Sequence, residues 1–131
     1  MPIERFSSAI PWEAAVGYSR AVRAGPFILI AGTTAADEDG VVACPADAYG
    51  QTVHVLDSLE DALAQAGARL EQVVQTRIYV VDIARSDEIG RAHGERFVDI
   101  RPVSTMVQVG ALIDPRMLVE IEAEAWMPTA G

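Results

Sequence analysis

The sequence predicts an α+β fold in which a mixed or antiparallel sheet carries two helices on one face. Apolar residues recur at every third or fourth position between 47 and 66, which is the period of an amphipathic helix. Apolar and polar residues alternate along 104–109 and 118–126, which is the period of a half-buried strand. The predicted order is strands, helix, strand, helix, strands, and we expect residues 1–131 to form one domain.

The first third of the chain predicts strands and turns. Residues 1–7 have weak strand character. Segments 18–24 and 27–31 flank Gly25-Pro26, a pair typical of tight turns, and therefore predict a β-hairpin. The acidic stretch 37–40 predicts a second turn.

The first helix is expected to begin near Pro45 or Asp47 and to stop at Gly67, because glycine suits the left-handed position after a helix. One apolar stripe faces its core side: Val53, Leu56, Leu59, Leu63 and Ala66. Residues 73–81 then predict a strand rich in β-branched side chains.

The second helix is expected after residue 82, with Ser86 as its N-cap and acidic residues in its first turn. A stripe stepping by four consists of Ile89, His93 and Phe97. Pro102 ends this segment. His93 has two interpretations, a hydrogen-bonded histidine at the edge of the core or a general acid–base near a cleft.

If both helices cover the Val/Ile side of the sheet, a polar face is left over. We expect this face to contain Gln75, Arg77, Tyr79, Ser104, Met106, Gln108, Glu120, Glu122 and Glu124. It is either exposed to solvent or packed against another subunit so that it frames a pocket. Tyr79, Met106 and Trp126 favour the second interpretation, since aromatic residues and methionine are enriched in interface cores.

Composition excludes several functions. The net charge of −9 argues against nucleic-acid binding and against docking on anionic lipid. The chain has no lysine for Schiff-base chemistry, and its one cysteine and two histidines lack zinc-site spacing, so no metal or cofactor is expected. No apolar run approaches the roughly 20 residues of a membrane span. Glu4 and Arg5 stand where a signal peptide needs apolar residues, and Cys44 is alone, so we expect a cytoplasmic protein.

Several segments together resemble a known family. They are YSRAVRAG at 18–25, Ala31-Gly32-Thr33, AGARLEQVVQTRIYVVDI at 66–83, RPVSTMVQVGAL at 101–112 and LVEIEAEA at 118–125. In order and spacing the chain resembles, from about Gly17 to Ala125, the Rid or YjgF-type family of imine and enamine deaminases and their relatives. The resemblance implies a chorismate-mutase-like fold and a homotrimer with clefts between subunits that bind a small molecule.

The resemblance also implies site residues. Glu120 matches the family's glutamate that helps to place the hydrolytic water, and Tyr18 matches its cleft tyrosine. Ala31 and Gly32, followed by Thr33, match the segment whose backbone contacts the substrate. Met106 lies on the same predicted face as Glu120 and is included among the substrate-binding residues.

The main departure from the family is Ser104. The active deaminases carry at this place an arginine that binds the substrate carboxylate through two contacts, and a hydroxyl cannot replace a guanidinium fork. Arg77 or Arg101 could act as a substitute anchor, or Arg77 could pair with Glu120 or Glu122. Ser104 either fills space or hydrogen-bonds a smaller polar ligand.

Two functions follow from this pattern. The first is a cofactor-independent hydrolase that deaminates an imine or enamine with water held by Glu120. The second is a non-catalytic trimer that binds a small molecule or another protein. A ribonuclease activity, attributed to some relatives, is disfavoured by the negative charge and the absence of lysine.

Overall fold

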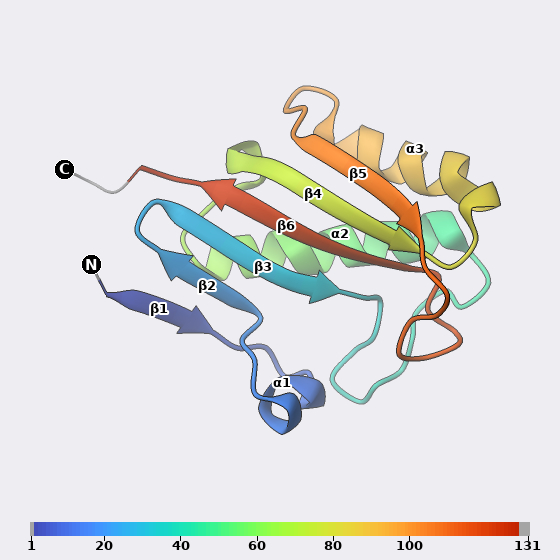
Figure 1. Cartoon of the computed structure of the whole chain (residues 1–131), viewed down its shortest axis with the longest axis horizontal. Coiled ribbons are helices and arrows are strands. Elements are labelled where there is room, and N and C mark those ends of the chain that lie inside the picture. Colours follow the sequence, from blue (N-terminus) through green and yellow to red (C-terminus); the bar gives the residue numbers. More distant parts are fainter. Residues whose placement is uncertain (1, 129–131) are drawn as a thin grey trace.

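The structure, a computed structural model that describes residues 2–128, is a six-stranded sheet with helices on one face (Figure 1). The strands are β1 (Ile3–Phe6), β2 (Ala21–Ala24), β3 (Phe27–Thr33), β4 (Val73–Val80), β5 (Val103–Gln108) and β6 (Val119–Trp126). The helices are α1 (Pro11–Val16), α2 (Ala48–Gln65) and α3 (Ser86–Phe97), with 3₁₀ turns η1 (Leu70–Gln72) and η2 (Ile83–Arg85).

The sheet is mixed, as the sequence predicts. Its strand order is β1-β2-β3-β6-β4-β5, and β4–β5 is parallel while the other pairs are antiparallel. Helices α2 and α3 both lie behind the sheet in Figure 1. The α+β fold with these two helices on one face is therefore confirmed, and we call the uncovered side of the sheet the open face.

The core lies between α2 and the sheet, where the predicted stripe of the first helix is buried. Leu56, Leu59 and Leu63 are at most 1% exposed and pack in one cluster with residues of β3 and β6, including Ile28 and Ile121. Burial of each such side chain contributes about 2 kcal/mol relative to exposure. Packing of this face thus fixes how α2 lies on the sheet.

The ends of α2 also agree with the sequence. The side chain of Asp47 accepts a hydrogen bond from the backbone N–H of Gly50 at 3.0 Å, which is N-cap geometry. After the helix, Gly67 has a φ of 85°, in the left-handed region that glycine adopts without strain.

The start of α3 corrects one prediction. Ser86 is not the N-cap but the first helical residue, with φ −58° and ψ −32°. The cap comes earlier, because the Asp82 side chain accepts a hydrogen bond from Ala84 N–H at 3.0 Å and starts η2. The chain then runs from η2 directly into α3, so Ser86 has no capping role.

Helix α1 is absent from the sequence prediction. Pro11 occupies its first turn and Gly17, with φ 92°, its C-terminal left-handed position. Proline in the first turn and glycine after the last turn are typical of a helix, but the six residues of α1 are too few for an apolar stripe. In Figure 1, α1 lies apart from α2 and α3, near the end of β1 and the start of β2.

The orientation of β5 is the second correction. In the parallel register, Ser104 pairs with Thr76 and Met106 with Ile78, so both belong to the helix-covered face and not to the face of Glu120. Alternation divides a strand into two sets without saying which set faces the helices. On this edge strand Ser104 and Thr105 are both exposed, so burial provides no signal either.

None of the helices in the described part of the chain is both long enough and apolar enough to cross a bilayer.

Candidate functional site

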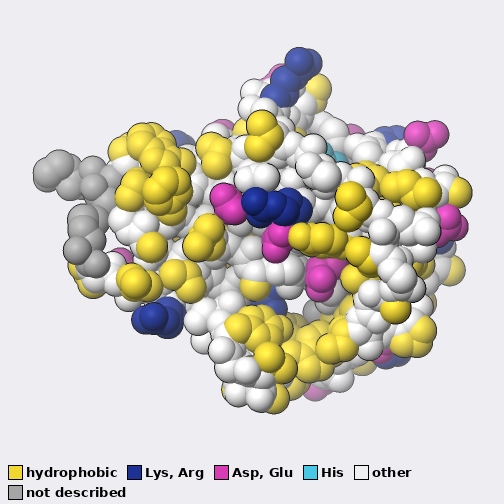
Figure 2. All heavy atoms as spheres, viewed as in Figure 1, with side chains coloured by type: hydrophobic (Ala, Val, Ile, Leu, Met, Phe, Trp, Pro, Cys, Tyr) yellow, Lys and Arg dark blue, Asp and Glu magenta, His cyan; other side chains and the backbone are white. Residues whose placement is uncertain are grey.

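A cavity of about 680 Å³ is lined by residues of the sheet, of α1 and of one face of α2. The hollow is visible in Figure 2 between the sheet and the part of the molecule that contains α1. Residues from four elements and their loops line it, among them Tyr18, Arg20, Gly32, Thr33, His54 and Glu120. We call this space the Glu120 cavity.

A β-bulge at the end of β3 shapes the wall of the cavity. Ile30 pairs with Ala123 and Thr33 with Ile121, so Ala31 and Gly32 together stand opposite one residue of β6. A bulge of this kind bends the strand and redirects the side chains that follow. As a result Thr33 is buried while the backbone of Gly32 faces the cavity beside Glu120.

Gly32 is required by the carboxyl group of Glu120. A Cβ atom at position 32 would lie 2.9 Å from Cδ of Glu120 and 3.2 Å from each of its carboxylate oxygens. The first distance is shorter than any ordinary contact between carbon atoms. The absent side chain of Gly32 therefore leaves the space in which the Glu120 carboxylate lies.

The carboxylate of Glu120 is half-buried, and none of the described residues donates a hydrogen bond or forms an ion pair to it. Burial raises the pKa of Glu120, and the negative charge of Glu122 raises it further, while Arg20 opposes both effects. Such a group is an acceptor without a partner. It can hold a water molecule or a ligand N–H and take up a proton.

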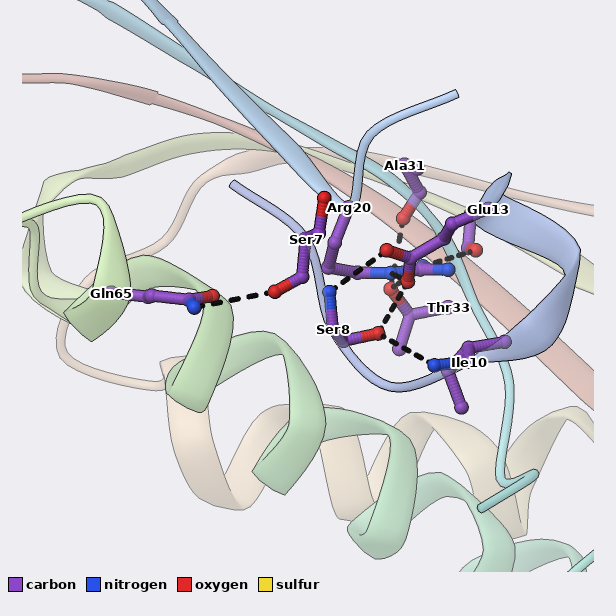
Figure 3. Close-up of polar contacts among 9 residues, drawn as sticks. Ser7, Ser8, Ile10, Glu13, Arg20, Ala31, Thr33 and Gln65 are labelled. Atoms are coloured by element: carbon purple, nitrogen blue, oxygen red, sulfur yellow. Dashed lines mark hydrogen bonds and ion pairs between the residues drawn. The ribbon is translucent and has the colours of Figure 1, made fainter. Parts of the chain in front are cut away.

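Arg20 joins α1 to the end of β3 in a buried polar network (Figure 3). Its Nε donates to the Glu13 carboxylate at 3.1 Å, and its Nη1 donates to the carbonyl of Gly32 at 2.8 Å and to Oγ1 of Thr33 at 3.1 Å. The Ser8 backbone N–H donates to the other carboxylate oxygen of Glu13, Oε1, and the Ser8 hydroxyl donates to Oε2, the oxygen that also accepts from Arg20. The network fixes the backbone of Gly32 and hence the wall against which Glu120 lies.

Sequence analysis missed Arg20 and Glu13 as site residues. Both are almost fully buried, at 7% and 4% exposure, which is rare for charged residues unless they are paired. The pair of Pro11 and Gly17 could have revealed α1. Nothing in the local pattern shows that α1 brings Glu13 to Arg20.

Comparison with known proteins decides the family. The model for the family described as Endoribonuclease L-PSP matches residues 7–127. The chain belongs to the Endoribonuclease L-PSP family. This is the YjgF or Rid family that the sequence resembles, so the resemblance is confirmed.

Individual L-PSP family members align over most of their lengths. An uncharacterized protein of Streptomyces coelicolor is 39% identical over 95% of this chain and 92% of its own. The 3-aminoacrylate deaminase RutC of Acinetobacter baylyi is 34% identical over 82% of this chain and 85% of its own. The crystal structure of Rv2704 of Mycobacterium tuberculosis, described as a member of the YjgF/YER057c/UK114 family, has a TM-score of 0.87 and 49% identity, covering 96% of this chain and 100% of that one.

Four of the residues that the L-PSP resemblance singles out meet in this chain: Tyr18, Gly32, Thr33 and Glu120 all line the Glu120 cavity. Ala31 lines a smaller adjoining hollow of about 390 Å³ that also includes Tyr18 and Arg77. Thr33 turns its hydroxyl inward, where it donates to the carbonyl of Ala31 at 2.8 Å.

Arg77 is engaged on the open face with two glutamates, neither of which is Glu120. Its Nη1 lies 3.1 Å from Glu124 and 3.5 Å from Glu122. The hydroxyl of Tyr79 donates to Glu122 at 2.6 Å, and this bond raises the pKa of Tyr79. Of the three glutamates on β6, two have partners and Glu120 has none among the described residues.

Ser104 and Met106 do not line the Glu120 cavity of their own chain. Ser104 accepts a hydrogen bond from the hydroxyl of Thr76 at 2.8 Å, and Oγ1 of Thr76 lies 2.9 Å from Nε2 of His93. Burial lowers the pKa of His93, which favours its neutral form. Met106 is half-buried against the core.

The other arginine considered as an anchor, Arg101, is exposed and does not line the Glu120 cavity. Its Nε donates to the carbonyl of Val98 at 3.1 Å, and its φ of 55° places it in a tight turn after α3. Among the described residues, no group of three or more histidine, cysteine or acidic side chains is placed to hold a metal ion.

Proposed function

We propose that the chain is a cofactor-independent deaminase that hydrolyses a reactive imine or enamine, with water positioned by Glu120. The observation that carries the proposal is the half-buried carboxylate of Glu120, which has no protein donor among the described residues and faces a cavity. The similarity to a 3-aminoacrylate deaminase supports the same class of chemistry.

The chemistry needs no redox partner. The oxygen of water forms a bond to the carbon of C=N while Glu120 accepts a proton from that water. The C–N bond then breaks, the electron pair stays on nitrogen, and the nitrogen leaves as ammonia or an amine after it takes up a proton. An enamine enters the same route after it tautomerises to the imine. The products are a carbonyl compound and ammonia or the amine.

We further propose that the active form is a cytoplasmic homotrimer in which neighbouring copies cover the open face. Hydrophobic side chains surround the charged centre of this face (Figure 2). Among the exposed ones are Phe27, Leu29, Val103, Val107 and Trp126. A surface of aromatic and aliphatic side chains around an arginine matches the composition of interface cores. Ser104 and Met106 lie on the helix-covered side of the edge strand β5, so we propose that they reach the cleft of the adjoining copy from the edge of the sheet and not from its open face.

The test of the deaminase is the decay of imines generated in solution from a panel of amino acids and amines. We expect the wild type to accelerate the loss of at least one imine with release of ammonia, and Glu120→Gln to lose about 10²-fold or more of this activity. Glu124→Gln is the matched control, because it makes the same change on the same strand at a residue that pairs with Arg77 and does not line the cavity. Equal rates for wild type and Glu120→Gln would remove Glu120 from the mechanism.

Ser104 favours a second candidate, a trimer that binds a small molecule without turning it over. Its hydroxyl stands where the resemblance to the Rid family implies a carboxylate-binding arginine. Arg77 is paired with Glu122 and Glu124, and Nε of Arg101 donates to the carbonyl of Val98. This candidate predicts thermal stabilisation by a ligand without ammonia release. Activity that appears only in Ser104→Arg would favour it over the deaminase.

The ribonuclease function in the family's description is not part of the proposal. The chain carries a net charge of −9 and has no lysine, so it does not neutralise phosphates well. RNA binding that weakens steeply with added salt would contradict this view.

A further inference from the structure

The Glu120 cavity extends well beyond Glu120, to residues of α1 and α2. Among the α2 residues that line it are His54, Ser58 and Asp61, which recur at helical spacing on one face. From α1, the apolar side chains of Trp12 and Val16 also line the cavity. The part of the cavity next to α1 and α2 is therefore amphipathic, and it adjoins the part that contains the Glu120 carboxylate.

The charges that line the cavity are mostly negative. Four acidic residues line it: Asp37, Glu38, Asp61 and Glu120. Arg20 is the one arginine among the lining residues. Its charge is met by Glu13 at 3.1 Å, and Nε and Nη1 already donate to Glu13, Gly32 and Thr33. A carboxylate in this space would be repelled by these acidic side chains, and the one arginine is already paired with Glu13.

The unpartnered carboxylate of Glu120 points to a ligand that donates hydrogen bonds. Glu120 accepts none from the described residues, and a carboxylate has only acceptor atoms when ionised. His54 lines the same cavity, but its unpartnered Nδ1 is buried, and an imidazole nitrogen donates or accepts according to the tautomer, so His54 sets no preference between donors and acceptors.

We propose that the cavity selects imines that are formed from amines and carry no carboxylate next to the C=N group. The cationic C=NH₂⁺ group of such an imine lies beside Glu120, and its apolar part lies between α1 and α2. The reaction part of this inference rests on the proposed function, whereas the preference for cations does not. The balanced step is R₂C=NH₂⁺ + H₂O → R₂C=O + NH₄⁺, in which a C–O bond replaces the C–N bond. A protonated imine is both attracted to the carboxylate and more reactive toward water.

Binding of four stable probes to the wild type tests the preference without any turnover. The probes are 2-phenylethylamine, phenylalanine, 3-phenylpropionate and 2-phenylethanol, and isothermal titration calorimetry measures each dissociation constant. We expect 2-phenylethylamine to bind about tenfold or more tightly than phenylalanine or 3-phenylpropionate, a difference of about 1.4 kcal/mol. The neutral alcohol should lie between the cation and the anion.

Two substitutions on α2 test whether the cavity itself causes the preference for the amine. Asp61→Asn should reduce the preference for the amine over the alcohol about twofold to fivefold, because Asp61 is exposed and solvent screens its charge. Asp57→Asn is the matched control, since it makes the same change on the same helix at a residue that does not line the cavity. An equal loss in both variants would mean that the overall charge of the protein, not the cavity, selects the ligand.

The outcomes separate this inference from the proposed function. Tight amine binding without hydrolysis of any imine would support the charge preference and contradict the deaminase. Rapid hydrolysis combined with tighter binding of 3-phenylpropionate than of 2-phenylethylamine would support the deaminase and overturn the preference. Failure of all four probes to bind would also overturn it.

Discussion

Neutralising Glu13 should destabilise the protein strongly, because Arg20 would then keep a buried charge without a counter-charge. The side chains of Arg20 and Glu13 are only 9% and 4% exposed, and their closest atoms are 3.1 Å apart. Removal of one member of a buried ion pair costs about 3–5 kcal/mol. We therefore expect Glu13→Gln, which keeps the shape of the side chain, to lower the free energy of unfolding by about 3 kcal/mol or more.

The double variant Glu13→Gln/Arg20→Met separates the charge effect from other contacts. It removes both charges but also the hydrogen bonds from Arg20 to Gly32 and Thr33, each worth about 1 kcal/mol. Its loss should be smaller than the sum of the two single losses, by at least about 2 kcal/mol. Such a coupling energy is the signature of a buried pair.

Urea denaturation at a fixed protomer concentration measures these differences, since any assembly adds a concentration-dependent contribution. Arg96→Met is the control variant for an ion pair at the protein surface, because Arg96 contacts Asp57 and Glu60 on the exposed surface of α2. An exposed pair of this kind contributes about 0–1 kcal/mol. If Glu13→Gln cost no more than Arg96→Met, the reasoning from burial would be wrong.

Three further predictions concern the site and its surroundings. Gly32→Ala should leave the free energy of unfolding within about 1 kcal/mol of the wild type, because the added methyl group displaces only the end of the Glu120 side chain. The same variant should lower the deaminase rate about 10²-fold, because Glu120 is then misplaced. An unchanged rate would contradict the placement of Glu120. Burial raises the pKa of Glu120, so the stability due to its protonated form is lost as the pH rises above 4.5 and through the folded-state pKa. Glu120→Gln should therefore be more stable than wild type at neutral pH in thermal unfolding, and lower stability would refute this. Burial lowers the pKa of His93, so the unfolded chain binds its proton first and stability should fall as the pH drops below 6.5; His93→Gln should flatten that part of the pH profile.

The sequence predicts the sheet and the two long helices because their burial patterns are regular. The stripe around Leu56 and Leu59 and the alternation around Ile121 each repeat often enough to define a buried face. The same alternation places Glu120 opposite that face. In each case burial depends only on how a single helix or strand faces the core, so it shows directly as periodicity in the sequence.

The prediction was wrong where several elements decide the outcome together. Ser104 and Met106 were assigned to the face of Glu120, whereas the parallel register with β4 turns them to the other side. That register depends on how the chain crosses from β4 through α3 to β5, which the alternation within β5 does not encode. Arg20 was missed for a related reason, since its partner Glu13 belongs to a helix too short to be recognised by its period.

The bulge at Ala31 and Gly32 makes the length of β3 as important as its composition. In a strand without the bulge, each residue of β3 would face one residue of β6. Deletion of a single residue at the bulge would restore this regular pairing. Such a deletion would either remove the glycine beside Glu120 or shift the loop that follows Thr33 toward the sheet by one residue. Relatives that keep this site should therefore tolerate many substitutions along β3 but no insertion or deletion at the bulge, even where surface loops nearby vary freely in length.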